Sequence, residues 1–258
     1  MIEYYVYTAS LASISIDARM SPQLLLCDDF ESLAKDLVAS SYVGSMCGCW
    51  LELILLIPRI FDFGQLVMIQ DTTDDSAIPT ADDFATFANL HANILHWSAP
   101  LTVATDVAVA GQIYQQAVLL YLYTALHPLR RPSSEEDGRN DGPGIYAASI
   151  RDTVTKVLAL LEVLSPTAQL NTSLCWPIAV VGSCVTDEKQ QRFLLDRLDR
   201  MFDVIGLGNI RLTAVLLRRF WDSTSATGAE VLTCTAADIG PWNICRIMYE
   251  NQIWISFA

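Results

Sequence analysis

The sequence predicts an all-α protein, folded as a single irregular helical domain of about eight to ten helices. Apolar residues recur at helical spacing in several segments, whereas period-two alternation is sustained only at residues 253–257. Hydrophobic residues make up 52% of the 258 positions, and the mean hydropathy is +0.32. A chain of this length and composition can bury one large core.

Two segments show the clearest helical pattern. Apolar side chains spaced by one, three or four positions from Ile150 to Leu161 predict a helix near residues 146–164, which is followed by Pro166. A similar stripe predicts a helix near 108–126, ending before Pro128. A third helix is predicted between Asp187, a typical N-cap, and Gly206, which marks its end. We expect further helices at residues 29–40, 49–63, 82–97 and 210–221.

One segment is predicted to be a long polar loop. Residues 130–144 are rich in Pro, Gly, Ser and charged residues and offer almost nothing to bury. The polar stretch 71–83 is a second candidate loop. Neither divides the chain into halves large enough to be domains. We therefore expect residues 1–42 to be a partly helical N-terminal extension and residues 43–258 to form the main helical domain.

The charge balance argues against direct nucleic-acid binding. Sixteen Lys and Arg residues stand against 29 Asp and Glu, which gives a formal net charge of −13. Neutralising phosphates requires the opposite balance. The arginines of the C-terminal half alternate with aspartates, so we expect them to form surface ion pairs. They are Arg192, Arg197, Arg200, Arg211, Arg218 and Arg219.

Membrane insertion and secretion are not expected. No uninterrupted apolar run of about 18 residues is present, and no basic leader precedes the apolar residues at the N-terminus. The seven cysteines are scattered and none forms a pair at the two-residue spacing of zinc or redox sites. We interpret them as reduced core residues of an intracellular protein.

An acidic cluster supports an alternative function as an enzyme. Asp71, Asp74 and Asp75 have the spacing with which class I terpene cyclases hold Mg²⁺ and, through it, a prenyl diphosphate. Aromatic residues such as Trp97, Tyr114, Tyr121 and Trp176 would suit a carbocation in an apolar cavity. The alternative interpretation is a solvated loop, with the acidic residues near 28 and 82 acting as helix caps. The second Mg²⁺ motif of such enzymes is missing, which weighs against catalysis.

No other pattern indicates chemistry. A Gly-x-Ser-x-Gly motif and a Gly-rich phosphate loop are both missing from the sequence. His91 and His96 are five residues apart, which places them on different faces of a helix and does not suit a metal site. We therefore expect no catalytic residue, no metal and no cofactor, with Mg²⁺ as the alternative if the chain is a cyclase.

Three segments resemble the fungal-specific transcription factor domain, the regulatory region that accompanies a six-cysteine zinc cluster. Residues 48–60 resemble its opening helix, residues 116–127 its tyrosine-bearing central helix, and residues 174–184 its apolar run around Trp-Pro. The resemblance covers about residues 43–257. Its signature residues here are structural, and they are Trp50, Glu52, Tyr121, Trp176, Pro177, Gly182 and Trp221.

The resemblance implies a fold and a function. Pro177 should lie at the first turn or kink of a helix, the Trp176 indole in the core, and Gly182 at a close helix contact. The implied function is a fungal transcriptional regulator without its own DNA-binding zinc cluster, in the nucleus or otherwise in the cytoplasm. It would control secondary-metabolite or other metabolic genes through other regulators, through chromatin-bound proteins, or through a small-molecule effector in a helical pocket.

Overall fold

The computed structural model describes residues 1–17, 26–73, 80–125, 146–226 and 240–257. These residues form ten α-helices and no strand, which confirms the predicted fold class. The helices are α1 (Ile2–Leu11), α2 (Asp28–Ala39), α3 (Leu51–Thr73), α4 (Ala81–His96), α5 (Thr105–Ala125), α6 (Ala147–Val163), α7 (Cys175–Ser183), α8 (Glu188–Ile205), α9 (Gly208–Ala226) and α10 (Ile244–Glu250). Three described 3₁₀ turns join them: η1 (Ala12–Ser15), η3 (Gln169–Ser173) and η6 (Pro241–Asn243).

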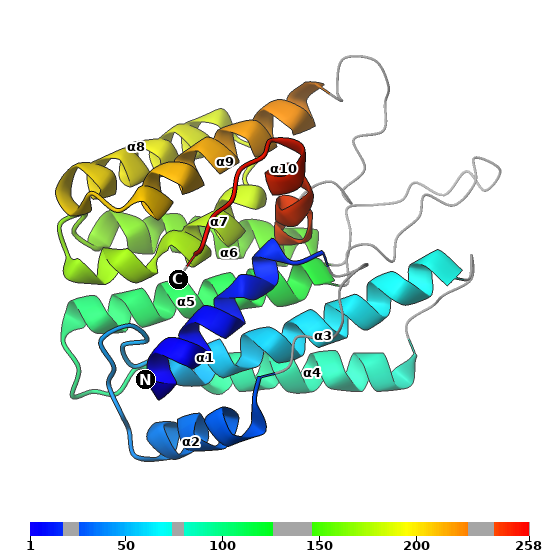
Figure 1. Cartoon of the computed structure of the whole chain (residues 1–258), viewed down its shortest axis with the longest axis vertical. Helices are drawn as coiled ribbons and strands as arrows, with labels where there is room; N and C mark the ends of the chain where they lie inside the picture. Colours follow the sequence, from blue (N-terminus) through cyan, green and yellow to red (C-terminus); the bar gives the residue numbers. More distant parts are fainter. Residues whose placement is uncertain (18–25, 74–79, 126–145, 227–239, 258) are drawn as a thin grey trace.

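Helix α5 runs through the middle of the molecule (Figure 1). It packs against α3 and α4 on one side and against α6 and α7 on the other. Helix α9 packs on α7, and α8 packs on α9. Helix α1 packs on α3 and also contacts α2. The N-terminal helix and the C-terminal segment 251–257 lie on the same face of the molecule (Figure 1).

The sequence of α5 explains its central place. It carries no charged residue after Asp106, and 14 of its 21 residues are buried, including every residue from Ala117 to Ala125. A helix that is apolar on all sides must be covered on all sides. The other helices therefore surround α5 rather than lying beside it.

The ends of α8 follow from its caps. The Asp187 carboxylate accepts hydrogen bonds from the backbone N–H groups of Lys189 and Gln190, both at 3.0 Å. At the other end Gly206 adopts the left-handed region, with φ +74°, and its N–H donates to the Phe202 carbonyl at 2.8 Å. Both predicted boundaries of this helix are confirmed.

Helix α3 is longer than predicted, because it ends at Thr73 rather than near Phe63. It passes through both Pro58 and Gly64 without a break. Gly64 is explained by packing, since a Cβ at this position would lie 2.3 Å from the indole of Trp242. The glycine admits an aromatic ring against the helix and does not end it.

Three helices were not predicted as such. Helices α1 and α7 are apolar around most of their surface, and all nine residues of α7 are buried, so no stripe distinguishes them from any other apolar run. Helix α10 is only seven residues long. The predicted polar loop at 130–144 lies outside the described residues. The second predicted loop, 71–83, is wrong at both ends, because residues 71–73 belong to α3 and residues 81–83 to α4, while residues 74–79 lie outside the described part.

A close contact joins α7 to α9. A Cβ at Gly182 would lie 2.7 Å from both δ-carbons of Leu217, and the Trp221 indole N–H donates to the Gly182 carbonyl at 2.9 Å. Pro177 is the third residue of α7, in its first turn, where its missing N–H costs nothing. The three packing expectations for Trp176, Pro177 and Gly182 therefore agree with the structure.

Replacing Gly182 by alanine should destabilise the protein. The added methyl group would displace the fully buried Leu217 side chain, and overpacking of this kind costs about 1–3 kcal/mol. Urea unfolding followed by far-UV circular dichroism should show a lower midpoint.

Gly208→Ala is the matched control, because nothing lies within 4 Å of a Cβ at that position. Its free energy of unfolding should stay within about 0.5 kcal/mol of the parent. A Gly182→Ala variant as stable as the parent would contradict the close α7–α9 contact.

Candidate functional site: an aromatic column and its polar anchors

Six buried or partly buried aromatic rings form a continuous aromatic column through the core. Successive centroids are separated by 5.1, 6.3, 5.8, 4.6 and 6.1 Å. All contacts are stacked except one edge-to-face contact between Tyr121 and Trp176. In order, the rings are Trp50, Tyr114, Trp176, Tyr121, Trp242 and Phe61.

The column is assembled around α5. Tyr114 and Tyr121 are seven residues apart, two helical turns, and therefore lie on the same side of α5. Trp176 of α7 contacts both tyrosine rings, while Trp50, just before α3, stacks on Tyr114. Aromatic pairs of this geometry add to the free energy of burial. Three of the sequence-predicted signature residues, Trp50, Tyr121 and Trp176, thus lie in one contact network.

The phenols of the column are held as hydrogen-bond donors. Tyr114 donates to the Ser173 carbonyl, and the Tyr7 hydroxyl of α1 lies 3.4 Å from the Tyr114 hydroxyl and 3.4 Å from the same carbonyl. Burial raises the pKa of Tyr7, Tyr114 and Tyr121 well above the usual value of 10.0. These phenols stay protonated at any physiological pH and cannot act as bases.

Two indole N–H groups in the column lack an acceptor. The Nε1 atoms of Trp50 and Trp176 are fully buried, and no group in the described part of the protein accepts a hydrogen bond from either. A buried donor without an acceptor costs about 1–3 kcal/mol. Unpartnered donors inside a well-packed core are rare.

Arg197 is a buried anchor between α8 and the end of α6, and its predicted role was wrong. It was expected in a surface ion pair, but the residue is only 4% exposed. Its guanidinium donates to the carbonyls of Leu161 at 3.1 Å and Leu164 at 2.6 Å. It also donates to the Ser165 carbonyl at 3.4 Å and to the Asn171 amide oxygen at 2.7 Å.

The position of Arg197 explains how a buried charge is tolerated. The negative end of the α6 dipole and four oxygen acceptors surround it, which favours a cation. Burial lowers the pKa of Arg197 to about 10, so the side chain is still charged at neutral pH. The sequence hid this role, because arginines and aspartates alternate along the whole helix.

Glu3 is the second anchor and joins α1 to the loop before α3. One carboxylate oxygen accepts hydrogen bonds from the N–H groups of Met46 and Cys47, both at 2.7 Å. The other accepts from the Tyr42 hydroxyl at 3.1 Å. A Cβ at Gly44 would overlap the carboxylate, so only glycine allows this approach. No sequence pattern indicated the pairing of Glu3 with a loop about 40 residues away.

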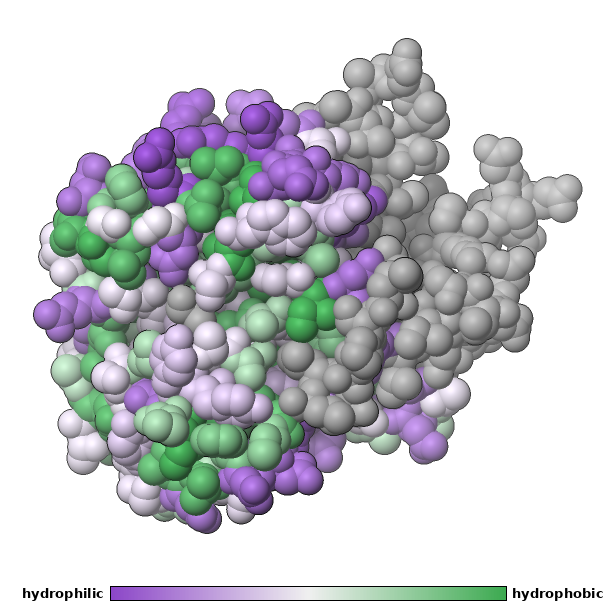
Figure 2. All heavy atoms as spheres, in the orientation of Figure 1, coloured by the Kyte–Doolittle hydropathy of each residue, from purple (hydrophilic) through white to green (hydrophobic). Residues whose placement is uncertain are grey.

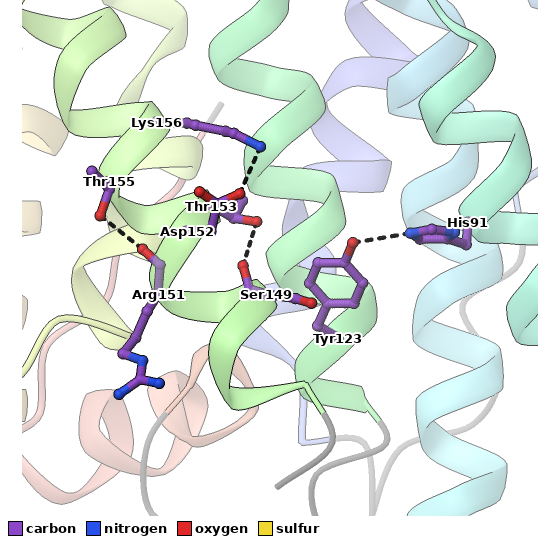
Figure 3. A network of polar contacts seen from close by, with 8 residues as sticks. All are labelled: His91, Tyr123, Ser149, Arg151, Asp152, Thr153, Thr155 and Lys156. Carbon is purple, nitrogen blue, oxygen red and sulfur yellow. Dashed lines mark hydrogen bonds and ion pairs between the residues drawn. The ribbon is translucent and has the colours of Figure 1, made fainter. Parts of the chain in front are cut away.

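His91 links two helices through a polar contact and a ring contact. Its Nε2 lies 2.9 Å from the Tyr123 hydroxyl, and its ring stacks on Phe87 with centroids 5.9 Å apart. Figure 3 shows the pair bridging two helices, with the ion pair between Asp152 and Lys156 (2.7 Å) nearby on α6. The contact ties α4 to α5. His127 lies outside the described residues.

The described cysteines are free thiols; Cys47, Cys175 and Cys184 are buried as expected for core residues, whereas Cys27 is exposed. Burial raises the pKa of Cys175 and Cys184 to about 12 and also raises the pKa of Cys47, Cys49 and Cys245. A thiol with a raised pKa is a poor nucleophile at neutral pH. Cys234 lies outside the described residues.

Two of the three aspartates of the acidic cluster lie outside the described residues. Asp71 lies in the last turn of α3 with its side chain beyond the described part, and Asp74 and Asp75 lie outside the described residues. At the start of α4 the cap is Thr80, whose hydroxyl accepts from the Asp83 N–H, and Asp83 completes a capping box. Asp82 is therefore a first-turn residue rather than the cap.

The remaining sequence-predicted residues are structural or exposed. Glu52 is exposed in the first turn of α3, where a carboxylate complements the helix dipole. Trp221 is 6% exposed and Trp97 is 7% exposed. Among the described residues no group of three or more His, Cys, Asp or Glu is arranged to hold a metal ion. None of the described helices combines the length and apolarity needed to cross a bilayer.

The comparison with protein families gives the chain its class. The model of the fungal specific transcription factor domain matches residues 1–254. The chain belongs to this family, and the family supports a fungal transcriptional regulator. The match includes residues 1–42, whose helices α1 and α2 pack on α3. No curated protein and no solved structure matches the chain.

Arg197→Ala should destabilise the protein strongly. It would leave four buried oxygen acceptors without their donor, and each buried polar group left unsatisfied costs about 1–3 kcal/mol. Thermal and urea unfolding should both report the loss.

Arg200→Ala removes the same charge from the exposed side of the same helix and serves as the control. Its effect should stay within about 0.5 kcal/mol. Equal effects of the two substitutions would show that Arg197 does not anchor α6.

The buried tyrosines predict a loss of stability at alkaline pH. Their folded-state pKa values are raised above 10.0, so the unfolded chain releases these protons first and stability falls as the pH rises above 10. Above pH 10, each such tyrosine lowers the free energy of unfolding by about 1.4 kcal/mol per pH unit until its folded-state pKa is reached. Urea unfolding between pH 8 and 11 should show a shallower pH dependence for Tyr114→Phe than for the parent, whereas the exposed Tyr249→Phe should match the parent.

Proposed function

We propose that this chain is a regulatory domain that controls transcription through protein partners and does not itself contact DNA. The family assigns it to transcription factors, and the charge of −13 disfavours a nucleic-acid surface. The acidic surface favours basic partners such as other regulators or chromatin-bound proteins. A nuclear location follows from this proposal.

The use of the polar groups supports a regulatory rather than a catalytic role. Arg197, Glu3 and His91 each tie two segments together through hydrogen bonds, and the buried phenols and thiols have raised pKa values. Residues with these roles set the positions of helices. They do not offer an acid and base to a substrate.

The turn between α8 and α9 is the best candidate for contact with a partner. Val204, Leu207 and Leu212 are 54%, 42% and 38% exposed. Charged side chains of both signs lie beside them: Asp203 and Arg211 are exposed, and Asp199 forms an ion pair with Arg218 at 3.8 Å. Figure 2 shows hydrophobic side chains at this end of the molecule with hydrophilic ones along the α8 and α9 edge. An apolar patch with a charged rim suits a partner helix that carries both apolar and charged side chains.

The two unpartnered indole N–H groups support a small-molecule effector. An effector that carried a carbonyl or hydroxyl oxygen could accept from Trp50 or Trp176 and would bind among aromatic rings. Such a ligand would enter the core beside α5, which packs against α3, α4, α6 and α7. We propose this as the route by which a metabolite would alter the partner surface.

A reporter assay tests the proposal. The chain would be fused to a heterologous DNA-binding domain in a fungal host, and reporter expression measured at matched protein levels. Leu207→Asp with Leu212→Asp should reduce the effect on the reporter several-fold, because carboxylates replace the apolar contact. Val163→Asp, at a 70% exposed position on α6, is the control and should not reduce it.

Two results would overturn the proposal. The first is specific DNA binding by the purified chain alone at physiological salt. The second is a prenyl product formed from farnesyl diphosphate and Mg²⁺ and lost in Asp71→Asn, Asp74→Asn or Asp75→Asn variants, which would favour the cyclase alternative. Deletion of the gene with transcript profiling should change the expression of metabolic genes.

A further inference from the structure

Two buried serines near the N-terminus use their hydroxyl groups differently from the other buried hydroxyl residues. Within the described part of the protein, seven serine and threonine residues are buried. Five of their hydroxyls donate to a carbonyl three or four residues earlier, at 2.7–2.8 Å, as hydroxyls inside helices commonly do. The exceptions are Ser10 of α1 and Ser13 of η1, whose hydroxyl oxygens are buried and have no hydrogen-bond partner among the described residues.

Both serines belong to a polar stripe on the buried side of α1 and η1. Tyr7, Ser10 and Ser13 follow one another at three-residue spacing, and each is at most 2% exposed. Residues three apart lie on the same side of a helix. A buried helix face is normally apolar, so a stripe of three hydroxyl groups facing the core needs an explanation.

The stripe faces the tyrosines of α5. At one end the Tyr7 hydroxyl lies 3.4 Å from the Tyr114 hydroxyl. At the other end Ser13 lies beside Tyr121, where its hydroxyl partly offsets the rise that burial causes in the pKa of that phenol. Ser10 lies between these two contacts along the stripe. It therefore faces the part of the core between Tyr114 and Tyr121.

Trp176 brings an unpartnered donor to the same part of the core. Its ring packs on both Tyr114 and Tyr121, with centroids 6.3 and 5.8 Å away. Tyr7 reaches the start of the same segment, since its hydroxyl lies 3.4 Å from the Ser173 carbonyl. The Trp176 indole N–H has no acceptor in the described part of the chain. We call this region the α1 seam: Tyr7, Ser10, Ser13, Tyr114, Tyr121 and Trp176.

We propose that the α1 seam is a binding site for neutral oxygen atoms, which accept from the Trp176 indole and share hydrogen bonds with the Ser10 and Ser13 hydroxyls. A bound water needs two to four or so polar partners, and these three groups meet that number. The hydroxyl or carbonyl oxygen of a small organic molecule has the same hydrogen-bonding chemistry.

The charges around the seam select a neutral ligand. An indole N–H can only donate, so an ammonium group would leave Trp176 unsatisfied. An anion is disfavoured as well, because the charged groups that act on the tyrosines of the seam are the carboxylates Glu3, near Tyr7, and Asp62, near Tyr121. Burying a charge without an opposite charge is costly. An uncharged oxygen meets both conditions.

The two possible sources of the oxygen relate differently to the proposed regulatory function. Bound water would be part of the fold, whether or not the chain regulates transcription. A bound small molecule rests on the proposed function, because it would be the effector inferred above. An empty seam would leave the reporter assay unaffected, so the failure of this proposal can be distinguished from the failure of the regulatory one.

Ser10→Ala tests whether the hydroxyl has a bound partner. If an oxygen atom is bound, the substitution removes one of its hydrogen bonds and should lower the folding equilibrium constant about fivefold or more. If the hydroxyl has no partner, its removal relieves the cost of burying it, and the constant should rise instead. Urea unfolding followed by far-UV circular dichroism measures the change and its sign.

Ser183→Ala is the matched control. Ser183 is equally buried, but its hydroxyl donates within its own helix, to the Val180 carbonyl at 2.7 Å. Both serines lie in the last turn of a helix, so the gain in helix propensity is similar for the two substitutions. The control should change the constant by less than about threefold. A Ser10→Ala variant that is as stable as the parent, or more stable, overturns the proposal.

A high-resolution crystal structure, combined with native mass spectrometry, identifies the source. We expect an ordered oxygen about 2.7–3.2 Å from the Trp176 Nε1 atom and within hydrogen-bond distance of a seam hydroxyl. Isolated density peaks and the bare chain mass of 28.5 kDa would identify water. Connected density and an added mass that is lost on denaturation would identify a small molecule. A seam without any ordered oxygen overturns the proposal.

Discussion

The whole arrangement depends on one constraint, that α5 cannot face water. Its 21 residues carry no charge after Asp106, and its last nine positions are buried on every side. Each of those residues removes apolar surface from water only if another helix covers it, and the gain is about 25 cal/mol per Å². Helices α3, α4, α6 and α7 supply that cover directly, and the others are held by these. The aromatic column extends the same contact, because both of its tyrosines come from α5.

Burying helices on all sides creates a second problem, which is the unpaired carbonyl groups at the helix ends. The protein solves it by donors from neighbouring helices. Gln115 of α5 donates to the carbonyls of Ile94 and Trp97 at the end of α4. Arg197 of α8 does the same for α6, and the Trp221 indole for α7. Each donor also fixes the distance between two helices, so these contacts determine the packing as well as the hydrogen bonding.

The helices that the sequence predicts well are those with one apolar face and one charged face. Helix α8 was located within one residue at either end, because it alternates apolar and charged faces and has a cap at each end. Helix α7 was recognisable only by its resemblance to the family, since nine buried residues in a row carry no period. Gly64 shows a related limit, because a glycine that admits Trp242 looks in sequence like a glycine that ends a helix.

The polar anchors were less predictable than the aromatic ones. Trp50, Tyr121 and Trp176 could be selected because large aromatic residues in apolar runs are usually buried. Arg197 could not be separated from five neighbouring arginines, and Glu3 meets a loop that no local pattern connects to it. Both depend on contacts between distant segments, over 26 to 36 residues for Arg197 and 39 to 44 for Glu3. Three-dimensional placement therefore decides which charged residues are structural.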